Sequence, residues 1–148
     1  MVTWMLQTLG KKTRYTDFTT TLTTQIFIKK GTAPNDPTSR NPKRTVIQHE
    51  EQHITDAIRI YTAYDVAASA YENDWQCPPC TDARIDYVSG VLLDYYIELY
   101  GLAAAQLDEN DSDGISEDHV KNAIEKKDAA NEKLLESLKK VEEICKNK

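Results

Sequence analysis

The stretch VIQHEEQHITDAIRIY, residues 46–61, has the apolar spacing of an amphipathic helix, and the rest of the fold can be worked out from it. Its apolar residues recur at short helical intervals: Val46, Ile47, Ile54, Ala57, Ile58 and Tyr61. This spacing places their side chains along one side of a helix, where they can pack against the rest of the chain. We expect the helix to run from about Pro42 to Glu72.

The same stretch contains His49-Glu50-Glu51-Gln52-His53, which is the pattern H-E-x-x-H. Histidines four residues apart lie one above the other on a helix, so both imidazoles can reach one metal ion. The carboxylate of Glu50 lies beside the pair, where it can act as a general base. The pattern predicts a Zn²⁺ site with His49 and His53 as ligands and Glu50 as the catalytic residue. The alternative interpretation is a solvated helix face that carries two histidines by accident.

The residues before this helix predict a β-rich segment and a loop. Thr, Ile, Phe, Tyr and Trp are frequent in residues 2–30, which predicts strands over 4–9 and 15–30 with a turn at 10–12. Gly, Pro, Asn and Asp are frequent in residues 31–41, as in loops. Asn41 fits the N-cap of the helix, and Pro42 fits its first position.

Two further helices are expected after the first one. The second, over residues 82–107, is indicated by apolar residues at helical spacing: Ile85, Val88, Leu92, Tyr95, Leu99 and Leu102. An acidic turn follows at 108–114, and Ser116 can cap a third helix that continues to the C-terminus. We therefore expect one α+β domain over residues 1–148. An antiparallel β segment and a loop occupy residues 1–41. Three long antiparallel helices follow: two of them form a hairpin that contains the H-E-x-x-H (42–107), and the third follows the acidic turn (108–148).

Antiparallel packing of the helices supplies candidates for a third metal ligand. If the first turn lies near residue 77, His49 lies opposite Ala105 and His53 opposite Gly101. Glu98 is then within about a turn of the metal and is the expected third ligand. His119 of the third helix and Asp94 are the alternatives.

The acidic turn at 108–114 also resembles part of a calcium-binding loop. If Gly114 takes the sixth position of such a loop, Val120 takes the twelfth, where a bidentate Glu is needed. A plain acidic turn between two helices is therefore favoured.

The chain has three cysteines, Cys77, Cys80 and Cys145, and Cys77-Pro78-Pro79-Cys80 is a C-x-x-C. A redox motif is one interpretation, but a structural disulfide or simple thiols in a loop are favoured because no βαβ pattern surrounds it. If a disulfide forms, we expect one bridge and one free thiol. The third helix should return toward the first turn, so Cys145 should lie near Cys77 or Cys80. A disulfide favours an oxidising compartment, and hence a secreted or periplasmic location. Residues 1–9 lack the features of a signal peptide.

The composition of the chain argues against nucleic acid as a partner and against a membrane span. The net charge is −6, and neither a basic patch with interleaved aromatic residues nor an apolar run of membrane-spanning length is present. We therefore expect a peptide or protein substrate, no nucleic acid and no membrane span. The C-terminal helix has one narrow apolar stripe, through which it could associate with a second copy.

A β-rich segment followed by a helix with His49, Glu50 and His53, and then by a second helix, resembles a zincin metallopeptidase. Within that group the order is similar to a minimal gluzincin or a small, bacterial, secreted zinc-protease-like domain. The resemblance implies zinc-dependent hydrolysis of peptide bonds, with Glu50 as general base and a Glu of the following helix, here Glu98, as third ligand. The chain departs from related patterns, because Asp56 and Arg59 stand where a longer zincin motif has Gly and His. The sequence N-E-x-x-S-D is absent around Glu98.

Two residue groups could assist such a reaction. Tyr95 of the second helix could stabilise the oxyanion, although aromatic residues at helical spacing are more often part of a core. The strand around residues 25–30 could pair with an extended substrate, although it could equally be an ordinary strand.

A non-enzymatic function remains the alternative. The chain could be a helical interaction or adaptor domain in which the H-E-x-x-H is degenerate or holds a purely structural metal ion. Bound zinc with one open coordination position would separate the enzyme from these alternatives.

Overall fold

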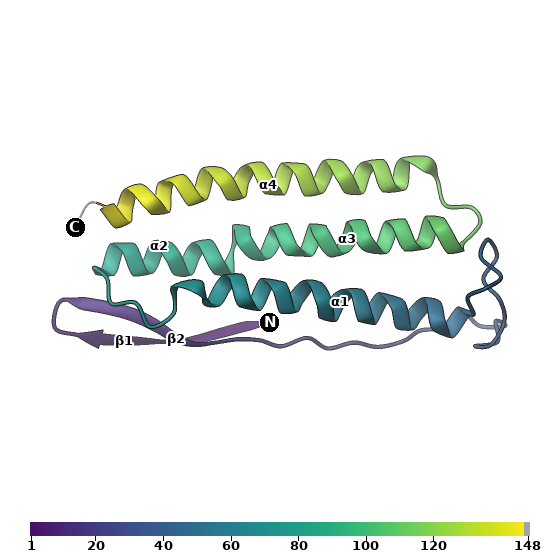
Figure 1. Ribbon diagram of the computed structural model, residues 1–148, viewed down its shortest axis with the longest axis horizontal. Helices are drawn as coiled ribbons and strands as arrows, with labels where there is room; N and C mark the ends of the chain where they lie inside the picture. The colour runs from purple at the N-terminus through teal and green to yellow at the C-terminus, as the bar shows by residue number, and fades with distance from the viewer. Residues whose placement is uncertain (147–148) are drawn as a thin grey trace.

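The computed structural model describes residues 1–146, in which a two-stranded antiparallel sheet is followed by four α-helices (Figure 1). The elements are β1 (Val2–Leu9), β2 (Lys12–Thr20), α1 (Val46–Ala68), a short 3-10 helix η1 (Ser69–Tyr71), α2 (Pro78–Ser89), α3 (Val91–Asp111) and α4 (Glu117–Lys146). In Figure 1, α2 and α3 follow one another between α1 and α4, and the chain reverses direction before α2 and before α4. The expected α+β arrangement of an antiparallel sheet followed by helices is confirmed.

The second strand is shorter than the sequence indicates. We expected a strand over 15–30, but β2 ends at Thr20 because its partner has ended there too. Val2, the first residue of β1, pairs with Thr20, and the backbone N–H of Thr21 donates to the carbonyl of Met1. Beyond this point the chain continues without a partner strand and runs along α1 (Figure 1).

Helix α1 begins four residues later than expected. Its N-cap is Thr45, whose hydroxyl accepts a hydrogen bond from the backbone of Gln48 while the side chain of Gln48 accepts one from the backbone of Thr45. This capping box satisfies two backbone donors at once, which is why Thr45 starts the helix in preference to Asn41. Asn41 instead belongs to the preceding turn, where Thr38 donates to its carbonyl.

The expected second helix is two helices, and it extends further at both ends. Gly90 separates α2 from α3, with φ −110° and ψ −98°. A Cβ at this position would lie 2.7 Å from the carbonyl oxygen of Asp86, so only glycine allows this close approach of the backbone. The helix was expected to end at residue 107, but α3 continues to Asp111. The added turn carries two acidic residues that matter for the site described below.

The core lies where β2 and the four helices α1, α2, α3 and α4 meet. Its fully buried aromatic side chains include Tyr15 of β2 and Tyr64 of α1, which donate hydrogen bonds of 2.6 Å to the carbonyls of Ala68 and Val88. Burial, and to a lesser degree the charge of Asp65, raises the pKa of Tyr64 to about 12. Other buried apolar members are Phe18, Ile85, Leu92, Leu134 and Val141.

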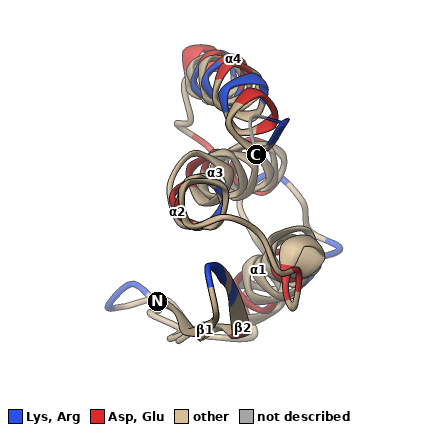
Figure 2. Cartoon of the chain, turned by 90° about the vertical axis from the view of Figure 1, so that its left-hand side faces the viewer, with Lys and Arg blue, Asp and Glu red and all other residues tan. Residues whose placement is uncertain are grey.

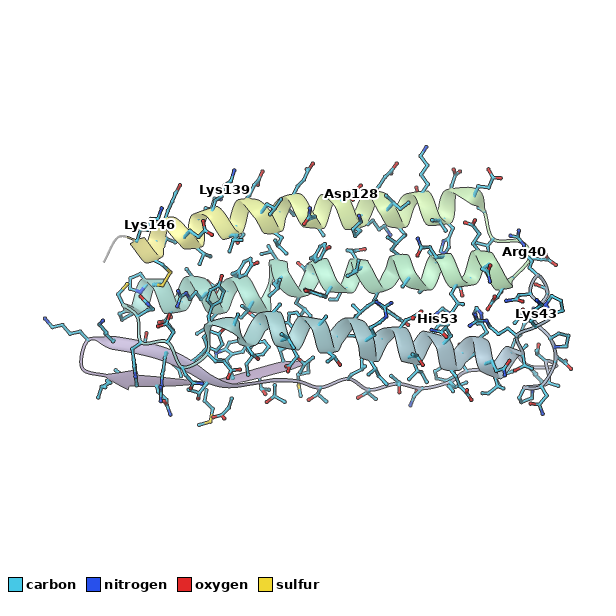
Figure 3. The ribbon with its side chains drawn as sticks, viewed as in Figure 1. Arg40, Lys43, His53, Asp128, Lys139 and Lys146 are labelled. Atoms are coloured by element: carbon cyan, nitrogen blue, oxygen red, sulfur yellow. A yellow bond between two sulfur atoms is a disulfide. The ribbon has the colours of Figure 1, made fainter. Side chains whose placement is uncertain are left out.

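A disulfide ties the end of the chain to the start of α2. Cys80 is bonded to Cys145 with their Cα atoms 4.7 Å apart, and Cys77 is a free thiol. This confirms the expected pairing of Cys145 with a residue of the C-x-x-C. The last turns of α4 are thereby fixed beside α2 (Figure 3).

The helices carry charged residues along much of their length, as the red and blue segments of α4 show (Figure 2). Within residues 1–146, no helix has both the length and the apolar character that crossing a bilayer would require.

Candidate metal centre

The two histidines of the H-E-x-x-H converge on Asp108, at the opposite end of the molecule from the disulfide. The Nε2 atoms of His49 and His53 are 3.1 Å apart. Oδ1 of Asp108 lies 3.0 Å from Nε2 of His49 and 2.9 Å from Nε2 of His53. Among residues 1–146, these three form the one group of His, Cys, Asp and Glu side chains that is close enough to share a metal ion.

Local helix geometry brings these atoms together. His49 is the fourth residue of α1, and His53 follows one turn later, so their rings stack edge to face with centroids 4.7 Å apart. His53 lies on the side of α1 that faces α3 (Figure 3). Asp108 is in the last turn of α3, which returns antiparallel to the start of α1. The site therefore depends on the turn of α3 that extends beyond residue 107.

Asp111 holds the ring of His49 from the other side. Its Oδ2 lies 2.8 Å from Nδ1 of His49 and 3.1 Å from Nε of Arg44, and the whole residue is fully buried. Its Oδ1 accepts hydrogen bonds from the side-chain amides of Asn41 and Asn110. Burial opposes ionisation of this carboxyl, but the hydrogen bonds from His49, Asn41 and Asn110 and the charge of Arg44 together lower its pKa.

The ionised carboxylate of Asp111 fixes the tautomer of the neutral His49 ring. A carboxylate can only accept, so Nδ1 of His49 carries the proton and, in the neutral ring, Nε2 carries the lone pair. Such an outer carboxylate is the usual partner of a metal-binding histidine. His53 has no equivalent partner, because its Nδ1 is buried without a hydrogen bond among the described residues.

The dimensions of the cluster fit a metal ion. In a tetrahedral zinc site with bonds of about 2.0–2.2 Å, ligand atoms lie about 3.3–3.6 Å from each other. The three separations of 2.9–3.1 Å are slightly smaller than this. In the neutral ring, Nε2 of His49 presents a lone pair toward Oδ1 of Asp108, and a cation held between the two atoms would attract both of them.

Glu50 lines an open cleft of about 360 Å³ next to the cluster. His53, Tyr61 and Tyr100 also line it, and the extended chain at residues 22–25 forms one wall. Burial raises the pKa of Tyr100, and the carboxylates of Asp56, Asp108 and Glu50 raise it further. The phenol of Tyr100 therefore lies within electrostatic reach of both the cluster and Glu50, and it remains a hydrogen-bond donor at neutral pH.

The other expected site residues lie elsewhere. Glu98 and Asp94 line a groove between α3 and α4 together with Lys126 and Lys133, and His119 is exposed in the first turn of α4. Tyr95 does not line the cleft, and its ring contacts that of Tyr96 at 5.4 Å.

The expected register of the helical hairpin was in error by about one turn, because His49 lies beside Asp108 and not opposite Ala105. Two acids of the segment that also resembled a calcium loop, Asp108 and Asp111, instead point toward His49. Their spacing of three residues could have indicated a shared helix face, if the helix had been expected to continue into the acidic segment.

No family model, curated protein or solved structure matches this chain.

Proposed function

We propose that the protein binds one zinc ion through His49, His53 and Asp108 and hydrolyses peptide bonds with Glu50 as the general base. The observation that carries the proposal is the convergence of two Nε2 atoms and one carboxylate oxygen within 3.1 Å, beside a cleft lined by Glu50. Asp108 takes the role that the sequence suggested for Glu98.

The ligand set favours a catalytic site over a structural one. Structural zinc sites are closed by four protein ligands, whereas catalytic sites use three and keep one position open. Within residues 1–146, the cluster has three members. Two histidines and one carboxylate also hold Fe(II) in some oxygenases, but the placement of Glu50 beside the cluster favours zinc-dependent hydrolysis.

When bound, zinc would polarise the substrate carbonyl and lower the pKa of water at the site. Glu50 accepts a proton from the attacking water and delivers it to the leaving amine. Tyr100 donates a hydrogen bond to the oxygen that becomes negatively charged. Burial, and then the charges of Asp56, Asp108 and Glu50, raise the pKa of Tyr100, so its phenol stays a hydrogen-bond donor.

The cleft would hold the residues of a peptide on either side of the scissile bond. Its walls are mostly uncharged, formed by Ile54, Ala57, Tyr61 and Ala104 on one side and by residues 22–25 on the other. We expected residues 25–30 to be a strand, either an ordinary one or one that could pair with an extended substrate. The structure has no strand there, but unpaired extended chain at 22–25 lies beside Glu50.

Two measurements test the proposal. Protein purified without added metal should contain about one zinc per chain, and chelation should abolish cleavage of a broad peptide library. Glu50→Gln should retain zinc and lose hydrolysis by at least about a hundredfold, the lower end for removing a general base. The matched control is Glu51→Gln, since Glu51 is the exposed next residue of the same helix.

The alternatives predict other results. A metal that binds but supports no cleavage, with equal behaviour of the Glu50 and Glu51 variants, would favour a structural ion. Absence of any metal binding would favour the non-enzymatic interaction domain. Cleavage that survives chelation would overturn the zinc mechanism.

A further inference from the structure

The charge of the chain is distributed unevenly between its first third and the rest. Residues 1–48 contain eight Lys and Arg and two Asp, which gives +6. Residues 49–148 contain ten Lys and Arg and 22 Asp and Glu, which gives −12. The net charge of −6 therefore conceals a basic amino-terminal segment on an acidic helical body.

Exposed apolar side chains concentrate in the same segment. Of the 14 large apolar side chains that are well exposed in the described residues, eight lie within residues 1–27. Met5 is 59 % exposed, Leu9 65 % and Phe27 77 %. Charged residues, which commonly protect an edge strand from association, are absent from β1, whose sequence is VTWMLQTL.

The basic and apolar side chains occur together along this part of the chain. Leu9 pairs with Lys12 across the hairpin, and Lys11 is at the turn between them. Phe27 is followed closely by Lys29 and Lys30. The four lysines are exposed, and among residues 1–146 none of them is in an ion pair.

These residues lie on one side of the molecule. The hairpin and the extended chain after it form the lower side in Figure 1, below α1, while α4 forms the upper side. The end-on view agrees, with the strands at the bottom and α4 at the top (Figure 2). We call residues 5–12 and 26–30 the amino-terminal surface.

We propose that the amino-terminal surface docks on an anionic lipid bilayer. Apolar side chains that project beside lysines match an interface in which acyl chains lie just below negatively charged headgroups. The acidic body would be directed away from the same headgroups, so the charge asymmetry also orients the molecule. A second copy of the chain is a poorer occupant, because two such surfaces would bring their unpaired lysines together. This inference is independent of the zinc chemistry.

Co-sedimentation of the full chain with vesicles tests the proposal. Vesicles of phosphatidylcholine and phosphatidylglycerol in equal parts should bind the protein, whereas pure phosphatidylcholine vesicles should bind at least tenfold more weakly. Binding should weaken as salt is raised, because screening reduces the attraction to the headgroups. Lys11→Ser with Lys12→Ser should lower the partition coefficient about 30-fold, if each lysine near the surface contributes its usual amount.

The matched control removes two exposed lysines from the opposite side, by Lys139→Ser with Lys140→Ser on α4 (Figure 3 labels Lys139). A second pair tests the apolar part: Leu9→Ser should weaken binding, and Leu135→Ser on α4, where Leu135 is 50 % exposed, should not. The proposal would be overturned by no binding to anionic vesicles, by equal binding to neutral ones, or by equal effects of the two lysine pairs. Concentration-dependent dimerisation that is lost in Leu9→Ser, without vesicle binding, would assign the surface to self-association instead.

Discussion

Oδ1 of Asp108 lies 2.9 Å from Nε2 of His53, although 55 positions separate the two residues in the sequence. The contact joins the second turn of α1 to the last turn of α3. It brings a carboxylate next to the histidine pair, in a group that is close enough to share a metal ion.

Replacing Asp108 should disable metal binding. Asp108→Ala removes the proposed third ligand, so we expect zinc affinity to fall by more than about 100-fold, beyond the range typical of outer carboxylates. Competition with a chromophoric chelator measures this. The matched control is Glu98→Ala on the same helix, which should bind zinc as the unaltered chain does. The reverse outcome would move the third ligand to Glu98.

Asp111→Asn tests the support behind His49. The amide keeps the shape of the side chain but loses the charge that faces Arg44 and the strong acceptor for Nδ1 of His49. Zinc affinity should fall about 10–100-fold, as for other carboxylates that orient a histidine ligand. Asp113→Asn, at an exposed position in the following turn, is the control. Equal affinities of the two variants would show that Asp111 does not orient the ligand.

Removing the disulfide should lower the free energy of unfolding. Cys80 and Cys145 are separated by 65 residues, and a crosslink over such a loop contributes about 4 kcal/mol if it acts by restricting the unfolded chain. Cys80→Ala with Cys145→Ala should show this loss in urea unfolding, whereas Cys77→Ala should change stability little. Unchanged stability of the Cys80 and Cys145 variant would contradict the contribution of the crosslink.

Alkaline pH should destabilise the core through Tyr64. Its pKa is about 12 in the folded protein, because burial and then Asp65 disfavour the phenolate, against an ordinary value of 10.0. The folded state thus holds this proton more tightly than the unfolded state, and the resulting stability is complete below pH 10 and is lost between pH 10 and about 12. Phenolate absorbance measured with and without denaturant should reveal the delayed titration. Coincident curves would contradict it.

The sequence predicted the main features that depend on local pattern. The helix with His49 and His53, the antiparallel strands and the return of Cys145 to the C-x-x-C all follow from residue spacing and from the order of the elements. Apolar spacing continues across Gly90 and did not show that the second helix breaks there, at a position where an added Cβ would lie 2.7 Å from the carbonyl oxygen of Asp86.

The third member of the cluster was missed for a different physical reason. Residues 108–114 have the composition of a turn, and local preferences alone would end the helix before them. Long-range contacts extend it: Arg40 donates from its backbone to the carbonyl of Asp111 and from its side chain to that of Glu109. These donors satisfy carbonyl groups that have no partner within the helix at its C-terminal end. The positive charge of Arg40 also interacts favourably with the partial negative charge at that end of the helix dipole. Arg40 and Lys43 lie in the loop beside this end of α3 (Figure 3).

The contacts of Asp108 and Asp111 with the two histidines have a kinetic consequence. They join residues 55 to 62 positions apart, so the chain must close a long loop before any of these contacts can form. Contacts of such high sequence separation form late and slowly in folding. The rate at which a refolding chain captures metal should therefore report the docking of α1 against α3, and not the earlier formation of either helix alone.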